Sequence, residues 1–552
     1  MSTSDPGMIE NPAQMTLPEA FRRAEQMRTD AVLQFFDREF TYQEIREYVD
    51  ALAAAWQDRG IQQGDAILIQ LQNVPQFIFT ALAAWEIGAV TVPVSPMYKA
   101  REVRRIQSDS QAVAWVTTPN IWERQGTETL EDSSLEQVYL TKLEDFGAGL
   151  PEKFAGLEDA DVDIDSVPQL YSLIDTLESF AGRTPRRATL QPSDTANFTY
   201  TSGTTGPPKA ALTTHGNMAF VGYTYPAFHG ASGPGHTVLA TAPLVHITGL
   251  AMHLGSWLMH AQKLVLTYRF DPKIQLDAMV ESQASWTTGA ATAYLSMLQV
   301  QDETPRDFSS LKFLGSGGAP IPTELAQRIE KFYGVALSPG YGLTESTGAV
   351  TSTPIDEQFR VDEASGIISV GRAFDGASLK IVDEDGNEQP TGERGEILLR
   401  GPGIVAGYWQ NADETSNVFL DGWLKTGDVG FVDEDSWLYI VDRTKNMIVA
   451  SGYKVWPREV EDVLYQVPGI HEAAVVGVPD DYRGETVVAA VSLSDPDKRA
   501  NWDDFEEQLR QHCKKHLANY KVPSRFIVKN DLPKNFNGKI QHREIVAEVA
   551  PQ

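Results

Sequence analysis

Two periodicities of hydrophobic and polar residues alternate along most of the chain. Short apolar runs predict buried strands, and longer runs with helical spacing lie between them. The predicted strands are residues 65–71, 90–94, 113–117, 239–242 and 263–266, and the clearest predicted helices are residues 75–87 and 100–108. Strands that alternate with helices predict βαβ units, in which helices cover both faces of a parallel sheet. We therefore expect an α/β fold with a large N-terminal domain.

The pattern changes twice towards the C-terminus. Residues 371–400 contain short apolar runs separated by Gly and Asp, and the DEDG sequence at residues 383–386 is typical of a hairpin turn. This segment predicts a small antiparallel, β-barrel-like subdomain. The elements predicted beyond it are helices at residues 457–464 and 502–516 and strands at residues 470–478 and 525–528. They form an α+β unit of ordinary domain size, so we expect one domain over residues 1–443 and a second over residues 444–552.

The composition excludes some classes of protein. The chain has 552 residues, of which 46 are Lys or Arg and 75 are Asp or Glu, for a formal net charge of −29. Such an acidic chain repels nucleic acid and anionic membranes, so neither is an expected partner. The single cysteine, Cys513, cannot form an internal disulfide, and the N-terminal residues show no apolar signal segment. We expect a cytoplasmic protein with no transmembrane segment, because the longest apolar stretch, residues 77–94, is interrupted by Glu86, Gly88 and Pro93.

Much of the negative charge lies in residues 128–165. One interpretation is an insertion that binds a partner, and the other is a solvated excursion on the surface. Acidic runs usually serve only to solvate a surface, which favours the second interpretation.

The most distinctive segment is TYTSGTTGPPK at residues 199–209. It follows a strand-like run and combines hydroxyl groups, glycines and a terminal lysine. Glycine leaves backbone N–H groups free to point at phosphate oxygens, while hydroxyls add donors and Lys209 adds positive charge. The segment is not a Walker A loop, because its spacing is Gly203-x-x-Gly206-x-x-Lys209 and because Ala210 stands where Ser or Thr would bind magnesium. The alternative is a flexible polar linker, which the length and detail of the segment disfavour.

This segment resembles the phosphate loop of the adenylate-forming superfamily of acyl-CoA synthetases, luciferases and nonribosomal peptide adenylation domains, although Ala210 replaces the usual glycine. Further segments resemble the motifs of that superfamily and follow in its order. They are FTYQEI (40–45), GAVTVPVSP (88–96), APLVHITG (242–249), YGLTES (341–346), GEILLRGPGIVAGYW (395–409), WLKTGD (423–428), DRTKNMI (442–448), SGYKVWPREVE (451–461) and LPKNFNGKI (532–540). The chain is therefore identified as a member of this superfamily, and residues 451–465 are similar to bacterial medium- and long-chain fatty acyl-CoA ligases.

The resemblance implies a large adenylation domain with parallel sheets and a barrel-like subdomain, followed by a small mobile α+β domain. It implies an ATP-dependent acyl-CoA ligase that forms an acyl-AMP with release of pyrophosphate and then an acyl-CoA thioester. ATP and CoA would be co-substrates, Mg²⁺ the cofactor and a medium- or long-chain fatty acid the substrate, and a homodimer is possible. The alternatives are an aryl-CoA ligase, an adenylation enzyme that loads a carrier protein, and a non-catalytic or luciferase-like relative. Residues 242–249 contain no aspartate to hold an amino acid, which favours the CoA ligase.

The residues that resemble nucleotide-binding motifs come from several segments. By resemblance, Tyr341 stacks on adenine, Thr344 donates to the α-phosphate and Glu345 binds Mg²⁺. Asp428 accepts hydrogen bonds from the ribose, with Arg443 as its partner. The other nucleotide-binding residues so implied are Thr201, Ser202, Gly203, Thr204, Thr205, Gly206, Lys209, Gly317, Gly318, Ala319, Pro320, Gly340, Gly342 and Tyr439. Without the resemblance, Glu345 would be interpreted as a helix N-cap element and Asp428 as a turn residue.

A lysine near the C-terminus is the expected catalytic residue. A mobile positive charge at Lys539 can offset the repulsion between a carboxylate and the α-phosphate, and the resemblance gives Lys539 this role. It also makes Lys445 a hinge between the two domains. The residues expected to form the CoA tunnel after adenylation are Ser451, Gly452, Tyr453 and Lys454. Taken alone, Lys539 would be a solvated surface charge.

The acyl pocket is expected beside His246, which we add to Thr344, Glu345 and Lys539 as a catalytic candidate. His246 could be a gate between the acid and the thiol, a base for the thiol, or a buried histidine bonded to the backbone. The other expected pocket residues are Gly249, Thr288, Gly289, Thr292, Gly315 and Ala349. Most of them are small, which favours a long or bulky apolar acid.

Overall fold

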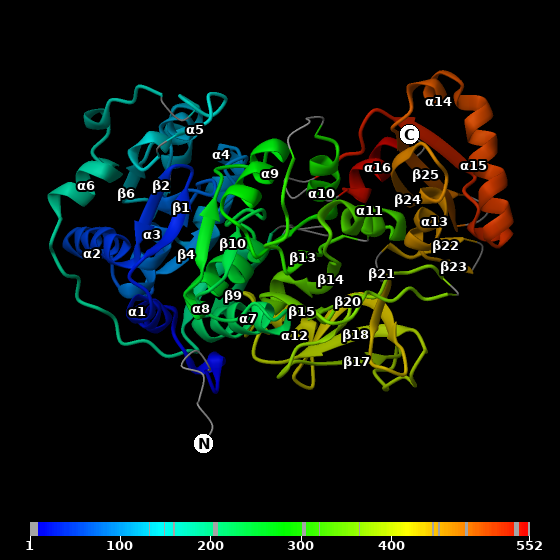
Figure 1. Cartoon of the computed structure of the whole chain (residues 1–552), viewed down its shortest axis with the longest axis horizontal. Coiled ribbons are helices and arrows are strands. Elements are labelled where there is room, and N and C mark those ends of the chain that lie inside the picture. Colours follow the sequence, from blue (N-terminus) through cyan, green and yellow to red (C-terminus); the bar gives the residue numbers. More distant parts are fainter. Residues whose placement is uncertain are drawn as a thin grey trace.

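A computed structural model gives the fold. It describes residues 9–131, 133–147, 149–157, 160–201, 208–300, 305–319, 321–363, 365–443, 446–450, 453–480, 484–534 and 540–549. These residues form four β-sheets, and the last sheet belongs to a C-terminal domain, orange and red in Figure 1, that lies at one end of the molecule.

Two large sheets form the N-terminal part. The first has the strand order β7-β6-β5-β3-β4-β8-β9 and is parallel except for β9, while the second has the order β16-β15-β14-β13-β12-β10-β11-β1-β2 and is parallel from β14 to β1. The strands of the first sheet are β3 (Ala66–Ile69), β4 (Val90–Pro93), β5 (Ala114–Thr117), β6 (Gln137–Leu140), β7 (Leu170–Ser172), β8 (Thr195–Tyr200) and β9 (Ala210–Thr214). Those of the second sheet are β1 (Ala31–Phe35), β2 (Arg38–Thr41), β10 (Thr237–Leu239), β11 (Lys263–Leu266), β12 (Trp286–Gly289), β13 (Phe313–Ser316), β14 (Leu337–Leu343), β15 (Gly348–Ser352) and β16 (Arg372–Ala373).

Helices connect and cover these strands. They are α1 (Leu17–Met27), α2 (Tyr42–Asp58), α3 (Pro75–Glu86), α4 (Ala100–Ser110), α5 (Pro119–Leu130), α6 (Leu173–Ser179), α7 (His215–Phe228), α8 (Ser256–His260), α9 (Pro272–Glu281), α10 (Ala291–Leu298) and α11 (Thr323–Tyr333), while α12 (Ala412–Val418) belongs to the smaller antiparallel subdomain described below. Several begin at a side chain that accepts from a free backbone N–H. Thr214 accepts from the backbone N–H of Asn217 at the start of α7, and Thr41 does the same for α2.

The main hydrophobic core lies between the two large sheets. It contains Ile67 and Val116 from the first sheet and Leu33, Trp286 and Phe313 from the second, together with residues of α1, α2, α3, α7 and α8. Helix α3 is buried along its whole length because it lies inside this layer, which explains why it is apolar on all sides apart from Gln76, Thr80 and Glu86. Separate cores join α4 and α5 to the first sheet and α9, α10 and α11 to the second. The prediction of an α/β fold with both sheet faces covered is confirmed.

Two smaller sheets follow. The antiparallel subdomain consists of β17 (Ser378–Val382), β18 (Gly395–Arg400), β19 (Phe419–Leu420), β20 (Trp423–Val432) and β21 (Leu438–Arg443). The DEDG segment forms the predicted turn, in which the N–H of Gly386 donates to the carbonyl of Asp383 (3.1 Å). The C-terminal domain consists of β22 (Ile448–Ala450), β23 (Tyr453–Val455), β24 (Ile470–Asp480), β25 (Gly484–Leu493) and β26 (Arg525–Lys529) with α13 (Pro457–Tyr465), α14 (Pro496–Ala500), α15 (Trp502–His516) and α16 (His542–Val549).

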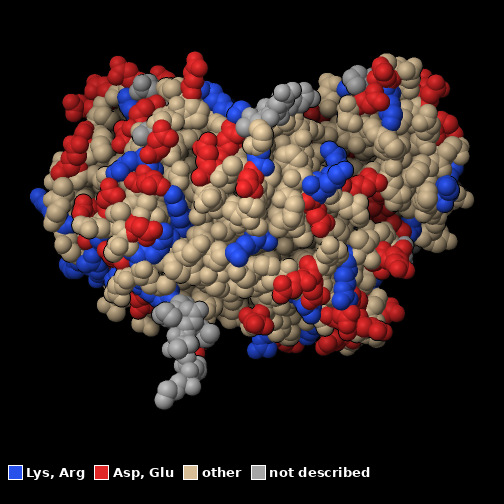
Figure 2. Space-filling model, in the orientation of Figure 1, with Lys and Arg blue, Asp and Glu red and all other residues tan. Residues whose placement is uncertain are grey.

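The acidic segment at residues 128–165 is part of the fold. It supplies β6, whose Val138 and Tyr139 are buried, and Phe154 packs into the main core. The segment is therefore not an excursion from the fold, but its acids are solvated as expected, since Glu128, Glu136 and Glu152 are exposed. Figure 2 shows acidic side chains spread over most of the visible face, and none of the helices that the structure describes is long and apolar enough to cross a bilayer.

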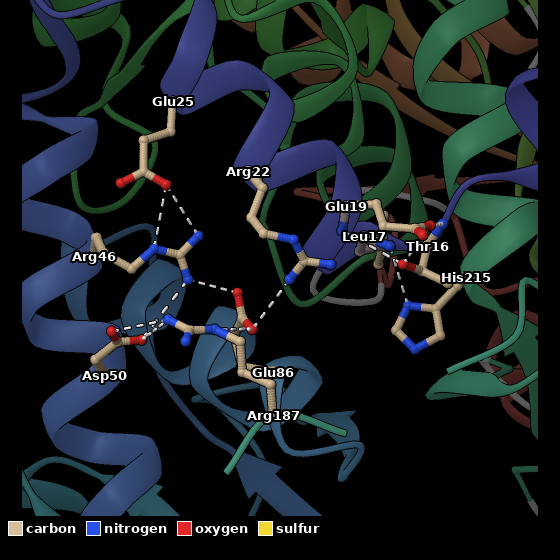
Figure 3. A network of polar contacts seen from close by, with 10 residues as sticks. All are labelled: Thr16, Leu17, Glu19, Arg22, Glu25, Arg46, Asp50, Glu86, Arg187 and His215. Atoms are coloured by element: carbon tan, nitrogen blue, oxygen red, sulfur yellow. Dashed lines mark hydrogen bonds and ion pairs between the residues drawn. The ribbon is translucent and has the colours of Figure 1, made fainter. Parts of the chain in front are cut away.

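A buried carboxylate joins the helices of the N-terminal part (Figure 3). Glu86 ends α3 and is 1% exposed, and its carboxylate lies 2.5 Å from Arg46, 3.2 Å from Arg187 and 3.5 Å from Arg22. Arg46 also contacts Glu25 (3.3 Å). These contacts join α1, α2, α3 and the segment that precedes β8. Glu86 is the buried member of this network, while Arg22 and Arg187 remain partly exposed and Arg46 has Glu25 as a second partner.

Candidate functional site

The phosphate-loop segment connects β8 to its antiparallel neighbour β9. At its base the N–H of Thr201 donates to the carbonyl of Lys209 (2.9 Å), and the N–H of Lys209 donates to Oγ1 of Thr201 (3.3 Å). These two bonds fix Lys209 where the chain enters β9. The predicted loop residues outside the part of the chain that the structure describes are Ser202, Gly203, Thr204, Thr205 and Gly206.

The side chain of Lys209 contacts two residues from a distant part of the sequence. Its Nζ lies 2.5 Å from Oε2 of Glu414 on α12 and 5.4 Å from the ring centroid of Tyr408. Tyr408 is close because its segment pairs with β9, where the N–H of Trp409 donates to the carbonyl of Ala210 (2.9 Å). Both charged side chains stay partly exposed, at 29% for Lys209 and 41% for Glu414.

The predicted Mg²⁺ ligand, Glu345, lies against the same segment. Thr344 and Glu345 begin the turn Thr344–Ser346 that follows β14. The hydroxyl of Tyr408 donates to Oε1 of Glu345 (2.6 Å), and the N–H of Val405 donates to the carbonyl of Glu345 (3.0 Å). Burial and the neighbouring carboxylate raise the pKa of Tyr408 well above its usual value, so this hydroxyl remains a donor.

A second cluster joins the expected adenine and ribose residues. The hydroxyl of Tyr341, on β14, donates to Oδ2 of Asp428 (2.6 Å), and Nε of Arg443 lies 3.1 Å from Oδ1 of Asp428. Asp428 and Arg443 are paired residues of β20 and β21, which explains their contact. Asp428 is 3% exposed, and burial together with this carboxylate raises the pKa of Tyr341 well above its usual value. Burial thus keeps Tyr341 protonated, so that its hydroxyl remains a donor to Asp428 and the two form a polar edge.

The glycines after β13 leave space beside that edge. Gly318 has φ +81° and open space where a Cβ would stand, whereas a Cβ on Gly317 would lie 2.8 Å from the carbonyl oxygen of Gly340. A flat base could approach the backbone at Gly318, while Gly317 is required for close strand packing. Gly342 also packs tightly, since a Cβ there would overlap Gly348. Ala319 follows these glycines, and Pro320 lies outside the described residues.

Three of the residues expected around the acid, Thr288, Gly289 and Gly315, lie near the C-terminal ends of β12 and β13. Thr288 and Gly315 are partners in the two strands, and Thr288 is 4% exposed. Nδ1 of His246 lies 3.1 Å from Oγ1 of Thr248, which selects none of its three interpretations. Thr292 is partly exposed in α10, whereas Ala349 packs into the main core.

Two of the predicted glycines do not open a pocket. A Cβ on Gly249 would overlap the carbonyl group of Pro243, and one on Gly289 would lie 3.0 Å from Cγ2 of Thr241. Gly249 thus serves close packing of the backbone and Gly289 packing against a side chain. At these two positions packing explains the small residue, so it does not by itself indicate a deep pocket.

Tyr439 lies away from the nucleotide cluster. Its ring stacks on Phe431 (centroids 4.9 Å apart), and its hydroxyl donates to Asp433 (3.3 Å). Burial and Asp433 raise the pKa of Tyr439 to about 12. The structure does not bring this residue to Asp428.

In the C-terminal domain, the structure describes residues that neighbour the expected hinge and CoA tunnel. Tyr453 is 57% exposed and stacks on Tyr520 (4.6 Å between centroids). Arg458 connects the domain to the subdomain before it, because its Nη1 donates to the carbonyl of Ile440 (2.7 Å). The predicted residues that lie outside the described ones are Lys445, Ser451, Gly452 and Lys539, and the side chain of Lys454 is likewise not described.

Sequence reasoning missed two residues of the site. Tyr408 lies inside a motif that the sequence identifies, but the sequence does not predict that its hydroxyl contacts Glu345. Glu414 carries no signal of its own, because an acid in the first turn of a helix is ordinary. Only the pairing of residues 407–409 with β9 brings both to Lys209.

The donor set fits a metal that binds through phosphate. No group of three or more His, Cys, Asp or Glu that could hold a metal occurs among the described residues. Glu345 offers a carboxylate oxygen beyond the one that Tyr408 occupies. One carboxylate together with phosphate oxygens is the environment that Mg²⁺ usually has in proteins, so the site fits Mg²⁺ bound with ATP.

Comparisons with known proteins show the family to which the chain belongs. Residues 20–409 match the protein family described as AMP-binding enzyme, and residues 459–539 match the family described as AMP-binding enzyme C-terminal domain. A long-chain-fatty-acid–CoA ligase of Bacillus subtilis is 31% identical over 527 residues, covering 94% of this chain and 91% of that protein. One of Salmonella typhimurium is 34% identical, covering 92% and 90%.

Solved structures give the same result. ATP-bound MatB from Rhodopseudomonas palustris superposes with a TM-score of 0.81 at 26% identity, covering 97% of this chain and 99% of that one. The anthranilate CoA ligase AuaEII in complex with anthranoyl-AMP has a TM-score of 0.85 at 23% identity and covers 98% of each chain, which shows the shared fold.

Proposed function

We propose which residues of this protein bind its substrates and which acid it takes, given that the chain belongs to the AMP-binding enzyme family and is an AMP-forming acid–CoA ligase. In the first step, a carboxylate oxygen attacks the α-phosphorus of ATP, and the bond to pyrophosphate breaks. In the second step, the thiolate of CoA attacks the acyl carbon, and AMP leaves. A hard condensation is thereby divided into two displacements.

One observation supports the assignment of the nucleotide site. Segments far apart in sequence are joined by direct hydrogen bonds at the ends of β8 and β14. Tyr408 contacts Glu345, its neighbour Trp409 bonds to β9 beside Lys209, and Tyr341 bonds to Asp428. Donors, a cation and carboxylates therefore converge on one region, as a triphosphate with its ribose requires.

We assign the nucleotide contacts accordingly. Lys209 would bind phosphate oxygens, with Thr201 and residues 202–206 supplying further donors. Tyr341 would present its ring to adenine, while its hydroxyl holds Asp428 in place to accept from the ribose. Thr344 would donate to the α-phosphate. Glu345 would hold Mg²⁺ together with phosphate oxygens, and the ion supplies charge neutralisation when bound.

The second domain is assigned the charge and the tunnel that the two steps need. Lys539, in the domain formed by residues 444–552, would lie between the carboxylate and the α-phosphate during adenylation. Lys445 would act as the hinge, and the segment at residues 451–454 would line the path of the CoA thiol. His246 would stand between the acid and that path.

The acid is proposed to be a fatty acid. The support is that relatives 31–34% identical over nine-tenths of the chain bear the name long-chain-fatty-acid–CoA ligase. The described part of residues 242–249 offers no carboxylate that would pair with a substrate ammonium, which disfavours amino acids.

Pyrophosphate release tests this proposal. Purified enzyme would be supplied with ATP, Mg²⁺ and a panel of straight-chain and aromatic acids, with and without CoA. We expect release with fatty acids and conversion to acyl-CoA only when CoA is present. No release with any acid would refute the function, and transfer only to a carrier protein would support the carrier-loading alternative.

A variant separates the two steps. Lys539→Ala should reduce adenylation by about 100- to 1,000-fold, which is the cost of losing one key transition-state donor, yet spare thioester formation from pre-made acyl-AMP. Lys529→Ala is the matched control, because Lys529 lies in the same domain and pairs with Glu548. Equal loss in both half-reactions of Lys539→Ala would contradict the assigned role.

A further inference from the structure

A tyrosine from α7 fills the space over the strand that would carry the acyl chain. Oη of Tyr225 lies 2.7 Å from Oγ1 of Thr288, so the two hydroxyls share a hydrogen bond. A Cβ built on Gly315 would overlap the hydroxyl oxygen of Tyr225 and would lie 2.5 Å from that of Thr288. A methylene group that crossed the strand at Gly315 would need the same volume.

The ring of Tyr225 is held in place from several sides. It makes edge contacts with Trp286, Phe313, Phe374 and His229, with centroids 4.9–6.1 Å apart. The residue is 2% exposed. A dense interior of this kind has no free volume into which the ring could swing, so it acts as a fixed wall.

The wall lies beside the strand that leads into the glycine turn of the proposed nucleotide site. Gly315 precedes Ser316, the last residue of β13, and the turn with Gly317 and Gly318 follows at once. The carboxyl group must be at this end of the strand to reach the α-phosphate. The tail therefore runs from the turn towards Gly315, where it meets the hydroxyls of Tyr225 and Thr288.

We propose that Tyr225 is the residue that limits the length of the acid, so that this enzyme takes short-chain carboxylic acids and rejects the tails of long-chain fatty acids. This rests on the proposed function, since it assumes that the acid lies beside Gly315. It departs from the expectation of a long or bulky acid, because that expectation counted small residues without the side chain that covers them. The two hydroxyls at the wall also disfavour an apolar chain end. A methyl group packed against them would make no hydrogen bond with either hydroxyl.

The dependence of kcat/KM on the chain length of the acid tests this proposal. We would measure kcat/KM for butanoate, hexanoate, octanoate, dodecanoate and hexadecanoate in the natural enzyme and in Tyr225→Leu, Tyr225→Phe and Phe228→Leu. Each methylene that does not fit should cost about tenfold or more in the natural enzyme. Tyr225→Leu should raise kcat/KM for the longer acids by about tenfold or more, since it removes the ring and the hydroxyl.

The two other variants are controls. Tyr225→Phe keeps the ring and should keep the same order of preference among the acids. Phe228 lies on the same helix and contacts Phe374 (4.9 Å), so Phe228→Leu removes a ring without opening the space at Gly315. It should also keep that order.

Each outcome bears on the proposal. Equal use of hexanoate and hexadecanoate by the natural enzyme overturns it, even if Tyr225→Leu fails to fold. An unchanged profile in a Tyr225→Leu enzyme that melts cooperatively also overturns it. Failure of the proposed function looks different, because no acid of any length would then release pyrophosphate in any variant.

Discussion

Removing the hydroxyl of Tyr341 should weaken productive ATP binding through Asp428. In the structure this hydroxyl donates to a carboxylate that is 3% exposed, at 2.6 Å, while Arg443 contacts the other carboxylate oxygen at 3.1 Å. Tyr341→Phe keeps the ring that would stack on adenine and removes only this donor. The change therefore isolates the support that Tyr341 gives to Asp428.

The magnitude follows from the charge of the acceptor. A hydrogen bond to an ionised group contributes about 1.5–3 kcal/mol, which corresponds to roughly 10- to 150-fold in kcat/KM. Arg443 still orients the carboxylate in the variant, so we expect the lower part of this range, about 10- to 30-fold. Since burial keeps the pKa of Tyr341 well above its usual value, the effect should be the same across the neutral and mildly alkaline range.

A double-mutant cycle is the assay. We would measure kcat/KM for ATP by pyrophosphate release, at a saturating concentration of acid, for Tyr341→Phe, Asp428→Asn and the double variant. Asp428→Asn removes the charge, so Tyr341→Phe should cost less in that background, with a coupling energy of about 1 kcal/mol. Additivity within about 0.4 kcal/mol would refute the reasoning, because the hydroxyl would then act independently of Asp428.

Two further predictions concern charge. Glu414→Gln should lower the KM for ATP by up to about fivefold, because a partly exposed ion pair of about 0.2–1 kcal/mol no longer competes with phosphate for Lys209. Asp413→Asn in the same helix turn is the control, and a raised KM for ATP in Glu414→Gln would contradict the prediction. Acid should destabilise the protein through its buried histidines, whose pKa values burial lowers from about 6.5 to about 4 or, in one case, to about 3. The unfolded chain takes up these protons between pH 6.5 and 4 and the folded chain does not, so this contribution to stability is complete above pH 6.5 and falls as the pH falls, by up to about 1.4 kcal/mol per histidine and pH unit. Thermal unfolding midpoints at pH 7.5 and pH 5 measure it, and equal midpoints would contradict it. The histidines are His215, His229, His253 and His260.

The sequence alone determined the elements and the order of the motifs. Apolar periodicity is a local property, so it correctly predicted α3 running into β4 through Gly88, the hairpin turn at residues 383–386, and the α+β unit at the C-terminus. Motif order identified the family, and with it Lys209, Tyr341, Glu345 and Asp428 as candidates. Each of these can be recognised from neighbours a few residues away.

Only the tertiary structure decided what these candidates contact. Glu414 reaches Lys209 because residues 407–409 pair with β9, and no local pattern encodes that pairing. Gly315 is one of the small residues that the sequence predicts to shape a pocket for a long or bulky acid, yet the space over a glycine is filled by whichever element packs against it. Here that element is α7 with Tyr225. A small residue indicates only that its own side chain leaves space beside the backbone. The side chains that fill this space come from distant segments of the chain. The depth of the acyl site is therefore decided by the packing of the whole fold.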